Sequence, residues 1–269
     1  LACDAFGPQK VHAVRMPSIY SSDDSKIDSV ELHKNLGCWD YEIPVEHEPI
    51  LRDLNDRYSL YMDQKNLVRS KLDNSEYNEI ADQNIQARLR DVYLMHFSNA
   101  YGAMPLSTGN KTESACGYYT HFDMNFSFAP IKDLYKYQVV DLAMRDSRIP
   151  ENVWNKAPSA ELAFDQTDED NLLPYKILDP LVMAYVEESI GSFDLFRDWC
   201  TINRLEHMGS DKEFLEEWLD SDQAPTEYER IAKMIGKMEY KRRQTCPGTK
   251  VSKVAFGVGR RLPVVKKWS

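Results

Sequence analysis

Short apolar runs alternate with segments of helical periodicity over the first hundred residues, and this alternation restricts the fold more than any other feature of the sequence. The runs typical of strands are "VHAVRMP" (11–17), "CWDYEIPVE" (38–46) and "GAMPLST" (102–108). The segments with helical spacing between them are 27–36, 50–58 and 85–100. Strands that alternate with helices predict an α/β fold, with a parallel sheet and helices on both of its faces.

Two glycines mark the ends of predicted helices. In "LACDAFGP", Gly7 stands at the usual position just after a helix, and Pro8 follows it. Gly37 closes the helix at 27–36 in the same way. No capping residue precedes the first of these helices, so we expect the sequence to enter within an element whose preceding strand and turn are missing.

Past Tyr175 the apolar residues recur at helical spacing, which predicts a mainly helical part. The segments with this spacing are 176–188, 193–200, 211–219 and 226–243. We therefore expect one domain, 1–269, with a truncated start. Within it we expect a sheet core at 1–150, a lid loop at 151–174, and a helical part with a basic tail at 175–269.

The composition favours a soluble protein of the reducing cytoplasm. Apolar residues make up 42% of the 269 residues, which is enough for a substantial core. No apolar run approaches the roughly 20 residues that a membrane-spanning helix needs, and the first residues lack the basic start of a signal peptide. The five cysteines are scattered, which argues against a disulfide framework or a zinc site.

The charge is unevenly spread. The net charge is −10, yet residues 241–269 hold nine Lys or Arg and no Asp or Glu. Such a basic tail is able to bind nucleic acid, to fold over a phosphate-bearing small ligand, or to contact a partner subunit. The overall acidic charge argues against nucleic acid as the partner.

The stretch "LSTGNKTESACGYYT" (106–120) has two interpretations. Asn110 suits the cap of a helix, and Glu113 would then stand at the third helical position, as in a capping box. Glu113 would equally suit a magnesium ligand beside a nucleotide triphosphate, because ligands bind beyond the carboxyl ends of parallel strands. Thr108, at the predicted strand end, would then contact the ligand.

Lys136 lies in "APIKDLYKYQVVDLA" (129–143). Asp133 is a plausible helix cap, which places Lys136 in the first helical turn. The helix dipole disfavours a cation there, so Lys136 needs a counter-charge, such as a phosphate. An exposed lysine without a ligand is the commoner case.

Three further features leave alternatives open. The segment 155–175 has no clear period and is either a lid that orders over a substrate or a solvated acidic loop. Arg88 and Arg90 lie two apart, so at most one faces a given site on a helix. His96 lies on the predicted apolar stripe, which favours a core histidine over a ligand. We see no Ser-His-Asp or Cys-His pattern and no G-x-G-x-x-G motif.

Several segments together resemble the synthetase domain of the NAD⁺ synthetase family, in the same order and over nearly the whole chain. They are "NIQARLRDVYLM", "STGNKTESACGYYT", "FAPIKDLYKYQVVDLA", "IPENVWNKAPSAEL", "DQTDEDNLLPYKILD" and "EYKRRQTCPGTKVSKVAFG". The resemblance implies an adenine-nucleotide α-hydrolase-like fold. It also implies ATP and Mg²⁺ as cofactors: ATP adenylates deamido-NAD⁺, and ammonia then displaces AMP. The tail favours the glutamine-dependent branch.

The resemblance also implies roles for individual residues. Lys136 and Asp123 are the implied catalytic residues, and Glu113 is the implied magnesium ligand. The implied ligand contacts are Arg15, Ser21, Thr108, Lys136 and Ser159 for ATP, and Arg88, Asp123, Asp168, Glu169, Lys241 and Arg242 for deamido-NAD⁺. A homodimer or higher homo-oligomer is implied as well.

The sequence departs from the family pattern in two ways. First, the family's S-G-G-x-D-S phosphate loop, expected just before Leu1, is absent from this sequence. The glutaminase domain that supplies ammonia is expected further upstream and is absent as well. In addition, Ser127 stands where the ammonia-dependent enzymes have an aspartate. We therefore expect a fragment of a longer ligase that uses glutamine or free ammonia. The alternative is a non-catalytic nucleotide-binding or dimerisation module that has lost the phosphate loop.

Overall fold

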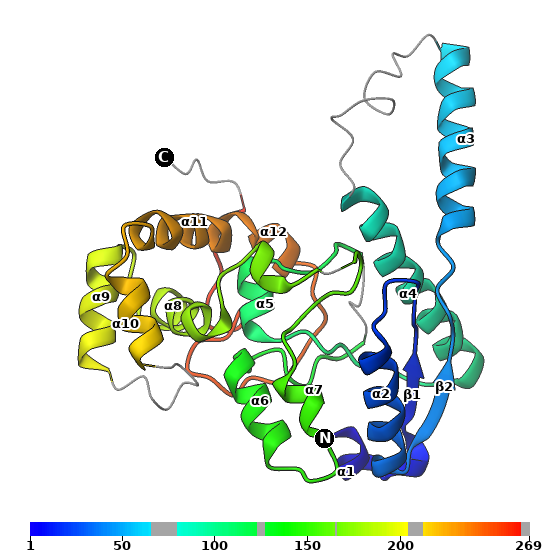
Figure 1. Cartoon of the computed structure of the whole chain (residues 1–269), viewed down its shortest axis with the longest axis horizontal. Helices are drawn as coiled ribbons and strands as arrows, with labels where there is room; N and C mark the ends of the chain where they lie inside the picture. The colour runs from blue at the N-terminus through cyan, green and yellow to red at the C-terminus, as the bar shows by residue number, and fades with distance from the viewer. Residues whose placement is uncertain (66–79, 123–126, 165, 204–211, 265–269) are drawn as a thin grey trace. The chain divides into compact units, whose positions relative to one another are not determined.

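The computed structural model of the protein describes residues 1–65, 80–122, 127–164, 166–203 and 212–264 (Figure 1). Contacts group the chain into two compact units. The first unit is Leu1–Ala103 with Ala160–Gln166, and the second is Met104–Ser159 with Thr167–Ser269. The division predicted from the sequence, at residues 150 and 174, stays a prediction.

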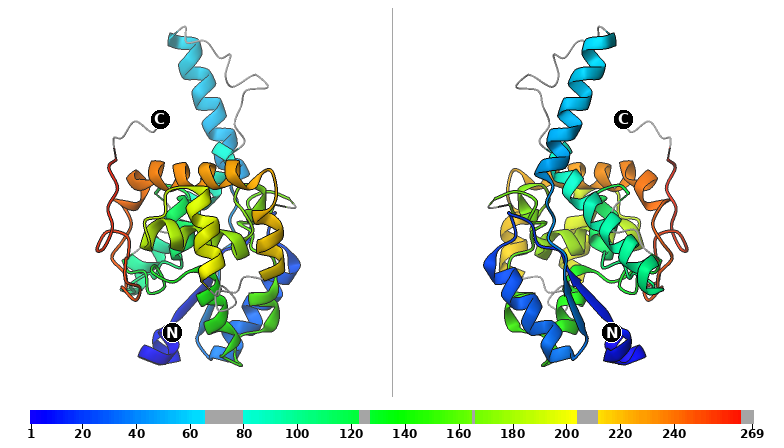
Figure 2. Two further views of the ribbon diagram at one scale, coloured as in Figure 1. Left: turned by 90° about the vertical axis from the view of Figure 1, so that its left-hand side faces the viewer. Right: turned by 90° about the vertical axis from the view of Figure 1, so that its right-hand side faces the viewer.

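The first unit holds a parallel pair of strands. His12 of β1 lies opposite Trp39 of β2, and Arg15 lies opposite Glu42. Figure 2 shows the two strands side by side. The elements of this unit are α1 (Ala2–Phe6), η1 (Pro8–Lys10), β1 (His12–Arg15), α2 (Asp23–Leu36), β2 (Trp39–Glu42), α3 (Glu48–Lys65) and α4 (Ile80–Tyr101). The strands predicted within 11–17 and 38–46 are therefore confirmed, over shorter ranges.

Helices cover both faces of this strand pair. Successive side chains of a strand point to opposite faces. On one face, the ring of Phe97 from α4 packs 4.9 Å from the ring of Tyr41 and 5.8 Å from that of His12. On the other face, Nδ1 of His33 from α2 lies 2.7 Å from Oδ1 of Asp40. The predicted arrangement, with helices on both faces of a parallel sheet, is confirmed for these two strands.

The predicted end of the helix before residue 38 is also confirmed. Gly37 takes the left-handed conformation, with φ 66°, and its N–H donates to the carbonyls of His33 and Lys34. At the other end, Oγ of Ser22 accepts a hydrogen bond from the N–H of Ser25 at 3.2 Å. A hydroxyl at the start and glycine at the end therefore set the length of α2.

The buried face of α4 differs from the predicted one. The sequence predicts a stripe that contains Val92 and His96, but Val92 is 59% exposed and His96 is exposed as well. The buried residues of this helix are Gln86, Ala87, Phe97 and Ser98. The prediction of a core histidine at 96 is wrong, because the contacts with β1 and β2 select a face that the apolar pattern does not mark.

The predicted strand at 102–108 is wrong within the described residues. Only an isolated parallel bridge forms there, between Leu106 and Phe128. The N–H of Ser107 donates to the carbonyl of Phe128 at 2.8 Å, and the N–H of Ser127 donates to the carbonyl of Pro105 at 3.3 Å. Pro105 has no N–H to extend the ladder, so the pairing stays short.

The second unit is mainly helical, as predicted past Tyr175. Its elements are α5 (Lys111–Cys116), α6 (Lys136–Met144), α7 (Glu151–Asn155), η3 (Asp168–Asp170), α8 (Tyr175–Glu187), α9 (Phe193–Ile202), α10 (Lys212–Leu219), α11 (Ala224–Lys237) and α12 (Glu239–Arg242). The segment 226–243 was predicted as one helix, but Met238 separates α11 from α12. Helix α8 contacts α5, α6 and α9 and lies among them in Figure 1.

The core of the second unit forms around α8. The side chains of Leu178, Leu181 and Val182 are fully buried, together with Phe196 of α9 and Ile231 of α11. This core holds α5, α6 and α8 together and so fixes the polar residues that they carry. The five cysteines are free, and in the described ranges no helix is long and apolar enough to cross a membrane.

Candidate functional site

The start of α5 is a complete capping box. Oδ1 of Asn110 accepts from the N–H of Glu113 at 2.9 Å, and Oε2 of Glu113 accepts from the N–H of Asn110 at 3.1 Å. Nδ2 of Asn110 also donates to Oε1 of Glu113 at 2.6 Å. The structural interpretation of Glu113 is therefore confirmed. Its side chain remains 23% exposed, so a cap does not prevent it from meeting a ligand.

Lys136 lies in the first turn of α6, as predicted, but the cap differs. Tyr135 precedes the helix, whereas Asp133 accepts hydrogen bonds from the N–H groups of Val251 and Ser252 at 2.8 and 2.7 Å. The prediction of Asp133 as the cap is wrong because the segment at 251–252 offers it two backbone donors.

Carboxylates supply the counter-charge that Lys136 was predicted to need. Its Nζ lies 4.0 Å from Oε1 of Glu113 and 5.3 Å from the ring centre of Tyr175. Asp168 is buried on η3 and accepts a hydrogen bond from Oη of Tyr175 at 3.0 Å. The structure thus brings together three of the predicted site residues, Glu113, Lys136 and Asp168.

These two carboxylates are costly to ionise. Burial raises the pKa of Glu113 and the pKa of Asp168, and the nearby charge of Lys136 lowers both. Asp168 raises the pKa of Glu113 further through its own negative charge. Because both pKa values stay raised, the single ammonium of Lys136 does not fully compensate the pair. An additional cation at this place would stabilise the ionised carboxylates.

A third carboxylate, Asp179, joins the two helices. It lies on α8 with 0% exposure. Its Oδ1 accepts a hydrogen bond from the hydroxyl of Thr112, and its Oδ2 accepts from the N–H of Tyr137 at 2.8 Å. Burial raises the pKa of Asp179 to about 6. We did not predict this residue from the sequence, although one acid in an otherwise apolar helical segment was a signal for it.

The start of α5 is held in place by a buried lysine. Lys111 has 0% exposure, and its Nζ lies 2.7 Å from Oε1 of Glu187, 2.7 Å from Oγ of Ser252 and 3.2 Å from Oδ1 of Asp133. The hydroxyl of Tyr135 donates to the same oxygen of Glu187 at 2.6 Å. This network fastens the segment around 252 to the helix that carries Glu113.

Lys241 and Arg242 hold the other end of α5. Nζ of Lys241 donates to the carbonyls of Gly117 and Tyr119, both at 2.7 Å. Arg242 is buried, donates to the carbonyl of Ala115 at 2.7 Å and pairs with Glu239 at 3.0 Å. Cations at a helix C-terminus are stabilised by the helix dipole. Contact of these two residues with deamido-NAD⁺ stays a prediction.

Four predicted residues of the second unit remain, namely Thr108, Asp123, Ser159 and Glu169. Thr108 is exposed just after the Leu106 bridge, and Glu169 is exposed on η3. Ser159 is partly buried and follows Pro158, whose carbonyl accepts a hydrogen bond from the N–H of Asp168 at 3.1 Å. Asp123 lies outside the described residues.

Three predicted residues, Arg15, Ser21 and Arg88, lie in the first unit. Oγ of Ser21 accepts a hydrogen bond from the N–H of Ser18 at 3.1 Å, within the loop after β1. Arg88 is partly buried on α4. Nε of Arg90 donates to the carbonyl of Met16 at 3.1 Å. The predicted contacts of Ser21 with ATP and of Arg88 with deamido-NAD⁺ remain predictions.

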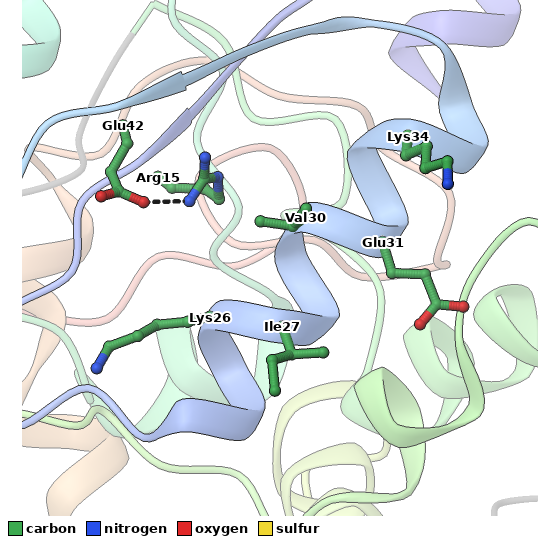
Figure 3. Close-up of a pocket in the computed structure, with 7 residues that line it drawn as sticks. All are labelled: Arg15, Lys26, Ile27, Val30, Glu31, Lys34 and Glu42. Carbon is green, nitrogen blue, oxygen red and sulfur yellow. Dashed lines mark hydrogen bonds and ion pairs between the residues drawn. The ribbon is translucent and has the colours of Figure 1, made fainter.

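Arg15 lines a pocket of about 490 Å³ in the first unit (Figure 3). Its guanidinium pairs with Glu42 and bonds Asp40 at 2.9 and 3.0 Å, which holds the pKa of Asp40 below its ordinary value. The remaining lining comes from α2 and comprises Lys26, Ile27, Val30, Glu31 and Lys34. The pocket therefore combines an apolar patch with charges of both signs.

Magnesium fits the chemistry of Glu113. Mg²⁺ prefers carboxylate oxygens, uses few of them, and takes its other ligands from phosphates and water. Glu113 offers one such carboxylate, partly exposed and with a raised pKa. No group of three or more His, Cys, Asp or Glu that could hold a metal occurs in the part of the chain that the structure describes. An ion at Glu113 would therefore depend on ligand phosphates.

Comparison with known proteins gives one consistent result. The family model for NAD synthase matches residues 1–245. The chain is 39% identical over 275 residues to a glutamine-dependent NAD(+) synthetase of Aquifex aeolicus. The alignment covers 100% of this chain and 42% of that protein. The chain is 34% identical to the enzyme of the same name from Thermotoga maritima, with the same coverage. The chain thus spans less than half the length of these curated relatives.

A solved structure shares the fold. It is a glutamine-dependent NAD(+) synthetase from Cytophaga hutchinsonii, with a TM-score of 0.63 and 16% sequence identity, over 95% of this chain and 39% of that one. An identity this low shows the fold alone. The likeness confirms the predicted α/β fold of the adenine-nucleotide α-hydrolase type.

Proposed function

This chain belongs to the NAD synthase family, and on that premise we propose that it forms the ligase site that converts deamido-NAD⁺ to NAD⁺ with ATP. The observation that carries the proposal is the grouping of Glu113, Lys136 and Asp168 in one unit of a chain of this family. Three charged residues from α5, α6 and η3 meet there, and the side chains of Glu113 and Lys136 stay partly exposed, at 23% and 26%.

The proposed reaction has two steps. A nicotinate carboxylate oxygen of deamido-NAD⁺ attacks the α-phosphorus of ATP, and the bond to pyrophosphate breaks. Ammonia then adds to the acyl carbon, loses a proton to water, and AMP leaves with the electrons of the acyl–oxygen bond. Both steps depend on the alignment of the reactants and on stabilisation of the charge that develops on the leaving group.

Lys136 is the proposed phosphate contact. Its ammonium lies 4.0 Å from the Glu113 carboxylate, which is beyond the distance of a direct hydrogen bond, so it keeps capacity for a phosphate oxygen. A cation placed there lowers the repulsion between a nucleophilic carboxylate and the triphosphate. Glu113 would hold Mg²⁺, which when bound offsets negative charge on the phosphates.

The other predicted contacts form part of the same proposal. We assign Arg15, Ser21, Thr108 and Ser159 to ATP, and Asp123, Arg88, Asp168, Glu169, Lys241 and Arg242 to deamido-NAD⁺. Asp123 is proposed to act together with Lys136 in catalysis. These assignments rest on the resemblance of the surrounding segments to the family.

We also propose the nitrogen source and the assembly. The curated relatives are named glutamine-dependent, which supports glutamine as the donor, through a glutaminase domain of the full-length protein, with free ammonia as a substitute. Exposed apolar side chains on α4, among them Ile80, Val92 and Tyr101, support a homodimer or higher homo-oligomer. The free cysteines support a cytoplasmic location.

The test uses the full-length protein with ATP, Mg²⁺ and deamido-NAD⁺, and with either ammonia or glutamine. We expect NAD⁺ with both nitrogen sources, detected by its reduction with alcohol dehydrogenase and ethanol. A protein that binds ATP in calorimetry but makes no NAD⁺ from either source would refute the proposal and favour a non-catalytic nucleotide-binding module.

A further inference from the structure

Asp179 occupies an unusual place between the two helices that carry the candidate reactive charges. Thr112, which donates to its Oδ1, precedes Glu113 directly in α5. Tyr137, whose N–H donates to its Oδ2 at 2.8 Å, directly follows Lys136 in α6. The N–H of Lys136 also reaches the hydroxyl of Thr112, at 3.4 Å. One carboxylate therefore connects the immediate neighbours of Glu113 and Lys136.

The burial of Asp179 calls for an explanation other than stability. Its side chain has 0% exposure in a core of Leu178, Leu181 and Val182. Burying a carboxylate is costly, and well-packed apolar replacements of buried charged groups are often neutral or stabilising. An apolar residue at position 179 would lack the two directional hydrogen bonds that Asp179 accepts, one from α5 and one from α6.

The spacing that these bonds maintain has a chemical consequence. Nζ of Lys136 and Oε1 of Glu113 are 4.0 Å apart. If α6 moved closer to α5, the ammonium and the carboxylate would form a direct hydrogen bond and would be less available to a ligand. If α6 moved away, a bound phosphate and its metal ion would not reach both side chains. The observed separation leaves each charge able to bind its own ligand atom.

We propose that Asp179 is a positioning residue for the ligase reaction, which acts through Thr112 and the Tyr137 N–H to fix the separation of Glu113 and Lys136. The inference rests on the proposed function, because it assigns Glu113 to magnesium and Lys136 to phosphate. Because Asp179 is fully buried, it acts through these two neighbours and not by contact with substrate or metal.

The experiment compares variants of the full-length protein in the complete reaction with ammonia. Asp179→Asn removes the charge and one acceptor, and Thr112→Val removes the hydroxyl while it keeps the side-chain shape. We expect both to raise the Mg²⁺ concentration for half-maximal rate by about 10-fold and to lower kcat by roughly 10- to 100-fold. We expect the KM for deamido-NAD⁺ to stay within about 3-fold of wild type.

Two controls separate positioning from general loss of structure. Thr112→Ser keeps the hydroxyl and should restore the magnesium dependence to within about 3-fold of wild type, whereas Thr112→Val should not. Val182→Ala lies in the same helix and core, and should lower thermal stability without a change in the magnesium dependence. Should Asp179→Asn fail to fold, the two Thr112 variants decide the question.

The outcomes are distinguishable. A wild-type protein that makes no NAD⁺ contradicts the proposed function itself. A wild-type protein that is active, with Thr112→Val and Asp179→Asn showing the magnesium dependence of wild type, overturns the positioning role alone. The positioning role is also overturned if Val182→Ala shifts the magnesium dependence as much as Asp179→Asn does. Less-than-additive effects in the Asp179→Asn, Thr112→Val double variant would support a shared action of the two residues.

Discussion

The buried lysine at the start of α5 gives the strongest prediction about stability. Lys111→Met keeps an unbranched side chain of similar length and removes the charge together with the hydrogen bonds that Nζ donates. Nζ of Lys111 lies 2.7 Å from Glu187 and 3.2 Å from Asp133, and these carboxylate side chains are 12% and 3% exposed. The substitution therefore leaves two nearly buried carboxylates without their cation.

The size of the effect follows from what remains around those carboxylates. Removing one partner of a buried ion pair costs about 3–5 kcal/mol. Glu187 keeps the hydroxyl of Tyr135, and Asp133 keeps the N–H groups of Val251 and Ser252. Although burial raises the pKa of Asp133, the hydrogen bonds from Ser252 and Val251 and the charge of Lys111 hold it below its ordinary value. Because this partial compensation survives, we expect the low end, about 3 kcal/mol.

The measurement is urea unfolding followed by circular dichroism, with the slope of the transition compared between variants. The matched control is Lys233→Met, which removes a lysine from a surface pair with Glu229 whose side chains are 50% and 67% exposed. That control should cost at most about 0.5 kcal/mol. The reasoning fails if Lys111→Met lies within about 1 kcal/mol of wild type, or if the two variants are equally destabilised.

The remaining predictions concern the site, the backbone and the thiols. Glu113→Gln keeps an oxygen for the N–H of Asn110 but loses the charge and the acceptor for Nδ2 of Asn110. Pyrophosphate release should fall by about 100-fold while the melting temperature stays close to wild type; full activity would limit Glu113 to a capping role. Gly117→Ala should lower the free energy of unfolding by about 2–4 kcal/mol, because φ is 62° and a Cβ would lie 2.6 Å from a methionine side chain. Gly102→Ala, with φ 63° and no atom within 4 Å, should cost only about 1–2 kcal/mol in the same titration, and equal losses would contradict the steric argument. Burial raises the pKa of Cys116 and of Cys200 to about 12, so both should resist iodoacetamide at pH 8 until urea is added, as read by peptide mass spectrometry; rapid labelling in the folded protein would contradict this burial.

Local rules predicted the parts of the fold that local chemistry decides. The end of α2 at Gly37 and the cap at Asn110 depend on residues within one turn, and the structure confirms both. The buried face of α4 depends on what packs against it, and apolar residues occur around most of that helix, so the predicted stripe with His96 was wrong. Pro105 is the residue that should have shortened the third predicted strand.

The candidate site divides in the same way. Glu113 and Lys136 stand out in the sequence because each occupies a particular position at a helix start. Asp179 does not, because its role depends on the packing of α5 and α6 against α8, and no local sequence pattern predicts these contacts. Asp133 was misassigned for the same reason, since its backbone donors come from residues more than a hundred positions later.

The attachments of α5 also determine when this site is completed during synthesis. A helix of six residues is too short to persist alone in water. Its first residue is held by Glu187 and Ser252, and its end by Lys241 and Arg242. A nascent chain that ends before residue 241 lacks three of these four residues, Lys241, Arg242 and Ser252. We therefore expect the helix that carries Glu113 to become stable only after residues 241–252 have left the ribosome.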